Sequence, residues 1–197
     1  MARERQFEEP EVLAAAADVF ARHGFQGTSL AMLMEATGLA KQSLYNCFGD
    51  KRSLYLKAMD DAVGRYAPVN RAMATAPDGR AALTAFFDHI VSACVSPDPA
   101  DRQCVVSAGL LEGVDDAAIR GDLLSKWGLS HEMLRAAIER GQKDGSIANP
   151  MPSAALADVL VSLTSGLRVT AQAEPGAERL RQTAALVLSL LDRPPPA

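Results

Sequence analysis

Residues 41–51, KQSLYNCFGDK, combine side chains that can bind nucleic acid. On a helical wheel at 100° per residue, one face carries only hydrogen-bonding side chains: Lys41, Gln42, Tyr45 and Asn46. Glutamine and asparagine amides can pair with adenine edges, lysine with guanine or phosphate, and tyrosine with phosphate. A helix of this width fits the DNA major groove, so the segment is predicted to contact DNA; a plain solvated face is the alternative.

The opposite face of this segment predicts how it is held in place. Leu44 and Phe48 point away from the polar side chains and are expected to dock on a preceding helix and on the first helix of the chain. Cys47 lies at the flank of this docking face, about 100° or more from Gln42 and Asn46, and is interpreted as a small packing residue.

The preceding helix is expected to begin at Thr28 or Ser29 and to end at Gly38. No Glu or Gln follows three residues after either candidate cap, so an incomplete capping box is expected. Leu30, Leu33 and Met34 mark one apolar face of this helix. Two short helices joined by a glycine turn predict a helix-turn-helix.

Further helices are predicted from apolar periodicity and from Gly and Pro punctuation. Pro10 between two glutamates starts a first helix that stops at Gly24. A fourth helix begins near Lys51. The others are expected at about 80–95, 102–113, 116–143, 153–172 and 177–191.

Length and composition fit one helical protein with two parts. The chain has 197 residues, 48% of them hydrophobic and 5% aromatic, and it is rich in Ala and Leu. We therefore predict an all-α fold of about nine helices. Residues 1–50 form the helix-turn-helix DNA-binding domain, and residues 51–197 a ligand-binding and dimerisation domain.

Charge and cysteine usage exclude several classes of protein. The net charge of −4 argues against wrapping of nucleic acid over the whole surface, while residues 36–57 hold four Lys or Arg against one Asp. The three cysteines show no zinc-ligand spacing, and no metal or cofactor is expected. No uncharged apolar run reaches the roughly 18 to 20 residues of a membrane helix, so a cytoplasmic protein is expected.

Two late segments, 154–167 and 183–191, are apolar almost all the way round. A single subunit has difficulty burying both, so we predict a homodimer; two central core helices of a monomer are the alternative. The predicted dimer-interface residues are Leu156, Leu160, Leu163, Leu167, Leu186 and Leu190.

Residues 24–59 resemble the DNA-binding domain of the TetR family of bacterial transcriptional regulators. The matching features include Gly24-Phe25, Thr28-Ser29, Ala36-Thr37-Gly38-Leu39, Ser43-Leu44-Tyr45, Phe48, and Lys51 with Leu54. Residues 102–113, 135–147 and 161–173 look more loosely like the branch of AefR-like and N-ethylmaleimide-responsive regulators.

The resemblance implies a nine-helix homodimer that binds double-stranded operator DNA through residues 41–48. It places Thr28, Tyr45 and Lys51 on phosphates and includes Ser29 and Ser43 in the interface. Two residues depart from the family pattern. Met34 replaces a small residue at a packing position, where its flexible side chain can fit, and Cys47 replaces an aromatic residue or His, which puts a phosphate contact there in doubt.

The resemblance also implies a repressor that a small molecule releases from its operator. Candidate residues of an apolar effector pocket are Met59, Phe86, Phe87, His89, Trp127, His131 and Met133. For each of them taken singly, plain core packing is the favoured role. Cys104 joins them as a possible electrophile sensor, because it is expected in the first helical turn after Asp101 and close to Arg102; a buried structural thiol is the alternative.

Two other functional classes stay open in the sequence. A helical enzyme could use Cys104 with His89 or His131, but no nucleophile-base spacing or phosphate-binding glycine loop supports it. A small-molecule carrier without DNA activity is the other class. Sequence-specific, salt-sensitive DNA binding separates the regulator from both.

Overall fold

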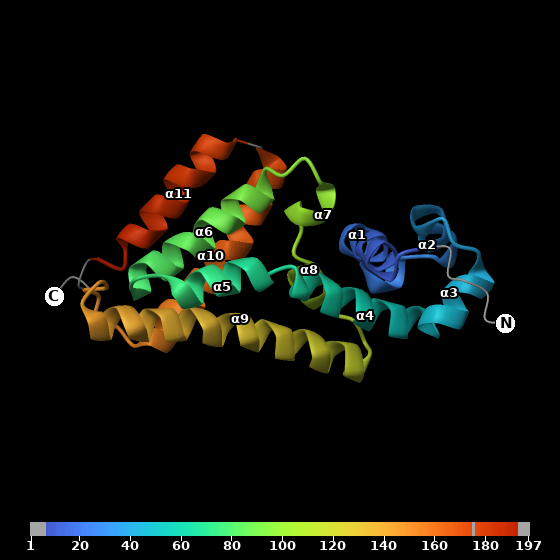
Figure 1. Cartoon of the computed structure of the whole chain (residues 1–197), viewed down its shortest axis with the longest axis horizontal. Coiled ribbons are helices and arrows are strands. Elements are labelled where there is room, and N and C mark those ends of the chain that lie inside the picture. The colour runs from blue at the N-terminus through green and yellow to red at the C-terminus, as the bar shows by residue number, and fades with distance from the viewer. Residues whose placement is uncertain (1–6, 175, 193–197) are drawn as a thin grey trace. The chain divides into compact units, whose positions relative to one another are not determined.

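The computed structural model describes residues 7–174 and 176–192, which contain eleven helical segments and no strand (Figure 1). The predicted all-α fold is confirmed. The helices fall into two compact units. Unit 1 comprises residues 1–65 and 103–125, and unit 2 comprises residues 66–102 and 126–197. The functional boundary after residue 50 divides the chain differently and stays a prediction.

Unit 1 is built around α1 (Glu9–Gly27), which packs against α2 (Leu30–Thr37), α4 (Lys51–Gly64) and α8 (Val105–Glu112). Its other helix, α3 (Lys41–Phe48), packs on α2 and α4. The predicted stop of the first helix is confirmed, because Gly24 adopts φ 71° and interrupts α1 before a last turn at residues 25–27. A left-handed backbone suits glycine, which has no Cβ to clash.

Unit 2 is a layered bundle in which α6 (Gly79–Cys94) packs against α5 (Ala67–Thr75), α7 (Pro99–Arg102), α10 (Ser153–Ala173) and α11 (Ala177–Ser189). The long helix α9 (Ala117–Asp144) begins in unit 1 and continues into unit 2. One apolar cluster from α5, α6, α9, α10 and α11 fills the interior of unit 2. This core fixes the faces that α10 and α11 leave exposed.

Two helices differ from the sequence-based expectation. Residues 67–75 form the separate helix α5, with Pro68 in its first turn, where the missing N–H of proline costs nothing. The single helix predicted at 102–113 is divided into α7 and α8 by an extended backbone at Cys104. No Gly or Pro marks that break, so periodicity alone could not place it.

Helix α10 is long and apolar enough, by length and composition only, to cross a membrane. Its sequence nevertheless carries Asp158 and Arg168, so the prediction that no uncharged run reaches membrane length still holds. Leu160 and Leu167 pack with α6 and α11 in the core of unit 2. A core helix passes the same test, so α10 is weak evidence for a membrane span.

Candidate nucleic-acid interface

Helix α3 has one buried face and one exposed polar face. Leu44 and Phe48 are 1% and 3% exposed. Cys47 is half-buried at the flank. The exposed side chains are Lys41, Gln42, Tyr45 and Asn46. The predicted division of the two faces is confirmed, although α2 and α4, rather than α1, supply the main packing surface.

The two amides predicted to read bases are already aligned with each other. The Gln42 side-chain N–H donates to Asn46 Oδ1 at 3.3 Å across one helical turn. Both side chains remain exposed. This pairing restricts their rotamers, which lowers the entropy lost on docking against base edges.

The turn between α2 and α3 is held by local hydrogen bonds. Ser29 caps α2 by accepting a hydrogen bond from the Met32 backbone N–H at 3.2 Å. The prediction of an incomplete capping box is wrong, because the Met32 sulfur accepts from the Ser29 N–H at 3.5 Å. A thioether is a weak acceptor that the usual capping-box pattern omits. Gly38 ends α2 at φ 68°, which directs the chain into α3.

Thr28 makes a local hydrogen bond within unit 1. Its side chain is buried, and its hydroxyl donates to the Gly24 carbonyl oxygen at 2.6 Å. The hydroxyl proton of Thr28 is thus engaged within unit 1, and its phosphate contact stays a prediction. Ser29 is exposed, and Ser43 is partly exposed.

Three lysines of unit 1 lie over aromatic rings: Lys41, Lys51 and Lys57. Lys41 Nζ is 5.7 Å from the Tyr45 ring centroid, and Lys51 Nζ is 4.8 Å from that of Phe25. Partial burial lowers the pKa of Lys51, against the opposing charge of Glu112. Such cation–π contacts hold each ammonium group against an aromatic ring, so the Lys51 side chain is partly immobilised before it contacts a phosphate.

Glu112, at the end of α8, was missed in the sequence. Its two carboxylate oxygens accept the backbone N–H groups of Phe25 and Gln26, each at 2.6 Å. These amides follow the break at Gly24, where the helix supplies no partner of its own. Nothing around Glu112 in the sequence distinguishes it from an ordinary surface glutamate, since the contact joins residues more than 80 positions apart.

Burial raises the pKa of the Tyr55 hydroxyl to about 12, and the nearby charges of Glu112 and Asp122 add to this shift. The Tyr55 ring also packs edge-on against Phe20 and Phe25, with centroids 4.9 and 5.2 Å apart. Glu112 therefore lies beside the aromatic core that supports the helix-turn-helix.

Six of the eight predicted effector-site residues belong to unit 2. Phe86 and Phe87 are buried with their rings edge to face, and Trp127 and Met133 pack partly buried against the same core cluster. His89 is half-buried and meets the Tyr66 ring at 5.2 Å. The structure thus brings these aromatic residues to one core, which fits both core packing and an effector site.

Met59 and Cys104 belong to unit 1. Met59 is fully buried on α4. Cys104 is half-buried at the N-cap of α8, not in the first turn of a helix introduced by Asp101 as predicted. The Arg102 guanidinium donates to the carbonyl oxygens of Ser96 and Pro97, so it is already engaged within its own loop.

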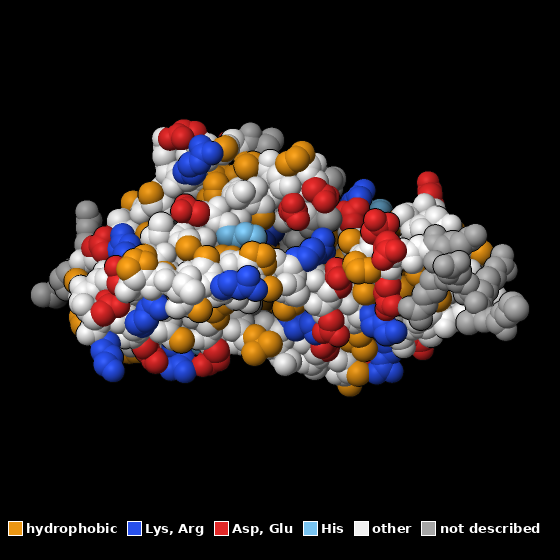
Figure 2. All heavy atoms as spheres, viewed as in Figure 1, with side chains coloured by type: hydrophobic (Ala, Val, Ile, Leu, Met, Phe, Trp, Pro, Cys, Tyr) orange, Lys and Arg blue, Asp and Glu red, His pale blue; other side chains and the backbone are white. Residues whose placement is uncertain are grey.

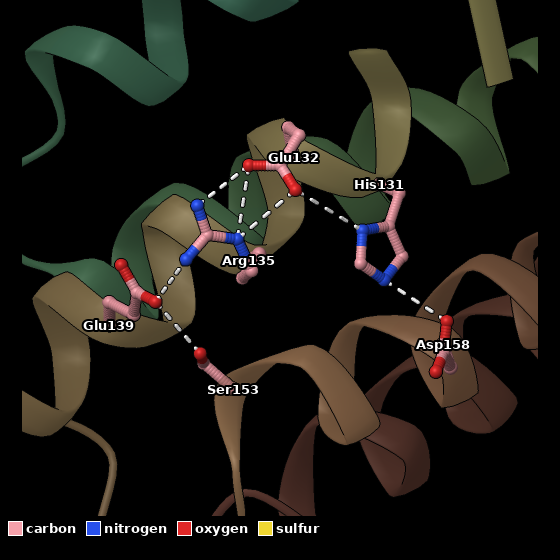
Figure 3. Close-up of polar contacts among 6 residues, drawn as sticks. All are labelled: His131, Glu132, Arg135, Glu139, Ser153 and Asp158. Atoms are coloured by element: carbon pink, nitrogen blue, oxygen red, sulfur yellow. Dashed lines mark hydrogen bonds and ion pairs between the residues drawn. The ribbon is translucent and has the colours of Figure 1, made fainter. Parts of the chain in front are cut away.

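His131 participates in an ion-pair network between α9 and α10 (Figure 3). Its Nε2 lies 3.0 Å from Asp158 Oδ1, and its Nδ1 lies 3.7 Å from Glu132 Oε1. Arg135 links Glu132 to Glu139, which accepts from the Ser153 hydroxyl at 2.9 Å. Nε2 of His131 therefore lies within hydrogen-bond distance of Asp158, which favours a structural role over effector binding.

The predicted dimer residues divide into buried and exposed groups. Leu156, Leu160 and Leu167 are at most 9% exposed inside unit 2, so a second copy cannot reach their side chains, and Leu163 is partly buried. Leu186 and Leu190 are 67% and 48% exposed. The sequence could not separate these groups, because both faces of α10 and α11 carry apolar residues.

Comparison with known proteins connects this geometry to a family. Residues 12–58 match the model described as "Bacterial regulatory proteins, tetR family". This segment spans α2, α3 and the turn between them, with most of α1 and α4. Residues 12–58 therefore match the N-terminal domain of TetR-family regulators. Regulators of this family are typically repressors of transcription.

Full-length relatives support this assignment. The chain is 28% identical to the uncharacterized HTH-type transcriptional regulator YezE of Bacillus subtilis, covering 98% of this chain and 100% of YezE. It is 26% identical to the HTH-type transcriptional repressor ComR of Escherichia coli, covering 95% and 90% of the two chains. These relatives are regulators, not enzymes.

A solved structure gives the same fold. A cysteine mutant of the TetR family transcriptional regulator CifR, complexed with 26bp double-strand operator DNA, superposes with a TM-score of 0.82 at 29% identity. The match covers 95% of this chain and 98% of that of CifR. The AefR-like branch stays a prediction.

Proposed function

We propose that this chain binds double-stranded operator DNA through α3 and represses transcription until a small molecule releases it. The main observation behind this proposal is the exposed polar face of α3, where the Gln42 side-chain amide donates a hydrogen bond to that of Asn46. Figure 2 shows acidic and basic side chains intermixed over the visible face, which fits a local DNA contact better than a broad basic surface.

The roles of the α3 residues separate in a binding experiment. Genomic fragments bound by the purified protein are selected and sequenced, and gel shifts are then run on the selected operator. Gln42→Ala or Asn46→Ala should weaken operator binding by about 1 to 3 kcal/mol and relax base preference. Tyr45→Phe or Lys51→Ala should weaken binding to all sequences alike and reduce its salt dependence.

The control is Gln182→Ala, which removes an exposed amide from α11 in unit 2. It should bind operator as wild type does. Equal loss of base preference in both sets of α3 variants would contradict the assigned roles. Absence of specific binding to any genomic fragment would favour the carrier without DNA activity.

The repressor is proposed to act as a homodimer through the exposed faces of α10 and α11. Val159 and Val169 on α10 are 47% and 65% exposed, and Leu186 on α11 and Leu190 just after it are 67% and 48% exposed. A second copy that covers these side chains would remove them from water. Leu186→Glu should therefore shift the protein from dimer to monomer in light scattering, whereas Glu178→Gln on the same helix should not.

Effector release is proposed to involve unit 2, where Phe86, Phe87, Trp127 and Met133 share one core. A second route, reaction of an electrophile at Cys104, is favoured by the partial exposure of this thiol at the start of α8. Cys104→Ser should bind operator but resist release by N-ethylmaleimide, and the matched Cys47→Ser should still be released. Release of both variants alike would exclude the Cys104 route. A cytoplasmic location accords with this function.

A further inference from the structure

A charged side chain is buried inside unit 2. Arg168, on α10, is 5% exposed and lies next to Leu167, which belongs to the apolar cluster. Its Nη1 donates to the carbonyl oxygens of Asp101 and Arg102 at 3.1 and 3.0 Å, and its Nη2 donates to the Tyr66 hydroxyl at 2.6 Å. The guanidinium on α10 therefore links the residue that precedes α5 to the end of α7.

All three of these acceptors are neutral. Among the described residues, no carboxylate pairs with Arg168, and its buried Nε has no hydrogen-bond partner. The Asp101 carboxylate instead accepts a hydrogen bond from the Ser96 hydroxyl at 2.7 Å. A buried cation is costly unless an anion neutralises it, so the site has unused capacity for negative charge.

The surroundings of Arg168 suit an anion with an apolar body. His89 on α6 lies in the field of Arg168, and its ring meets that of Tyr66. Burial is the main cause that lowers the pKa of His89, and Arg168 adds to it, whereas the charge of Asp101 raises it. A neutral imidazole ring can donate one hydrogen bond. Phe86 and Ile90, which lie close to His89 in the sequence of the same helix, are buried in the apolar cluster of unit 2.

We propose that Arg168, with Tyr66 and His89, binds the carboxylate of a small monocarboxylic acid whose apolar part packs against the apolar cluster of unit 2. This inference rests on the proposed function and names the class of effector. Guanidinium groups bind carboxylates through charge-assisted, often bidentate hydrogen bonds. An incoming carboxylate would take over N–H groups that now bind the Asp101 and Arg102 carbonyls, which end α7.

The first test compares acids with their neutral amides on the wild-type protein without DNA. Benzoate and octanoate are measured against benzamide and octanamide by thermal unfolding and titration calorimetry. At ten times its Kd, a bound acid should raise Tm by about 3 to 6 °C, and its amide should have little effect. Equal shifts by acid and amide, or no shift by either acid, would overturn the proposal.

The second test removes the charge. Arg168→Gln keeps hydrogen-bond donors and should weaken acid binding by about 10- to 100-fold. Arg181→Gln is the matched control, because it removes an exposed arginine from α11 of the same unit, and its affinity should equal that of wild type. Unchanged acid binding by Arg168→Gln would refute the assignment.

If Arg168→Gln fails to fold, crystallography of the wild-type protein can still test where the acid binds. Wild-type crystals soaked in 4-bromobenzoate should show the bromine anomalous peak beside Arg168, with the carboxylate on the guanidinium. A peak at another place only would overturn the site. None of these measurements uses operator DNA, so failure of the acid site and failure of the regulator assignment are distinguishable.

Discussion

Replacing Glu112 should destabilise unit 1 through two specific hydrogen bonds. Its carboxylate accepts the N–H groups of Phe25 and Gln26, each at 2.6 Å. In Glu112→Ala both amides lose this acceptor, at the point where Gly24 interrupts the helix. The cost comes from the backbone, because no other part of α1 can supply the missing partners.

The magnitude follows from the exposure of the two amides. A hydrogen bond to a charged group contributes about 1.5 to 3 kcal/mol when it is shielded from water. Phe25 is half-buried, whereas Gln26 is exposed and can bind water instead, so the second bond contributes less. We expect Glu112→Ala to lower the free energy of unfolding by about 2 kcal/mol, which corresponds to a fall in Tm of roughly 4 to 8 °C.

Two further variants sharpen this measurement by thermal and urea unfolding. Glu112→Gln retains one carbonyl oxygen and should lose about half as much stability. Glu35→Ala removes an exposed glutamate from α2 of the same unit and should change Tm by less than about 1 °C. If Glu112→Ala unfolds at the same temperature as Glu35→Ala, the anchoring role of Glu112 is refuted.

Three other substitutions probe the packing and charge of the two units. Gly24→Ala should cost about 1 to 3 kcal/mol, because φ 71° with ψ 175° is a backbone conformation that essentially only glycine adopts. The new Cβ would also clash with the Glu112 carboxylate 2.6 Å away; in a double-mutant cycle Glu112→Ala should relieve this clash, and strictly additive costs would contradict it. Leu44→Ala should lower the free energy of unfolding by about 2 to 5 kcal/mol, since the side chain is 1% exposed, whereas exposed Asn46→Ala should change it little. For His89, the unfolded chain takes up a proton near the ordinary pKa of 6.5 but the folded chain only at lower pH, so stability is complete above pH 6.5 and falls below it. In denaturant titrations across this pH range, the free energy of unfolding of His89→Gln should depend less steeply on pH than that of the wild type. An unchanged slope would exclude His89 as the cause.

Local sequence patterns were sufficient to predict the helix-turn-helix. The positions of Gly24 and Gly38, and the alternation of Leu44 and Phe48 with polar residues, depend on interactions within a few residues. They therefore appear directly in the sequence. The failure there was also local. The Met32 sulfur replaced the expected Glu or Gln of the capping box.

The packing of unit 2 was harder to predict from the sequence, because its important contacts join distant segments. Apolar residues cover both faces of α10, so periodicity could not show that Leu160 faces the core while Val159 is exposed. Arg168 did leave a signal, as the only charged residue between Asp158 and Glu174 in an apolar helix. What that charge binds depends on Tyr66, 102 positions away.

The sequence by itself determined the helical class, the helix-turn-helix and the polar face of α3, since these depend on short-range periodicity, capping and turn chemistry. Only the tertiary structure decided which leucines of α10 and α11 remain exposed, that Glu112 completes the break in α1, and that Arg168 is buried among neutral acceptors. The physical reason is that burial and hydrogen-bond partners are properties of packed segments, and a linear pattern does not specify which segments meet.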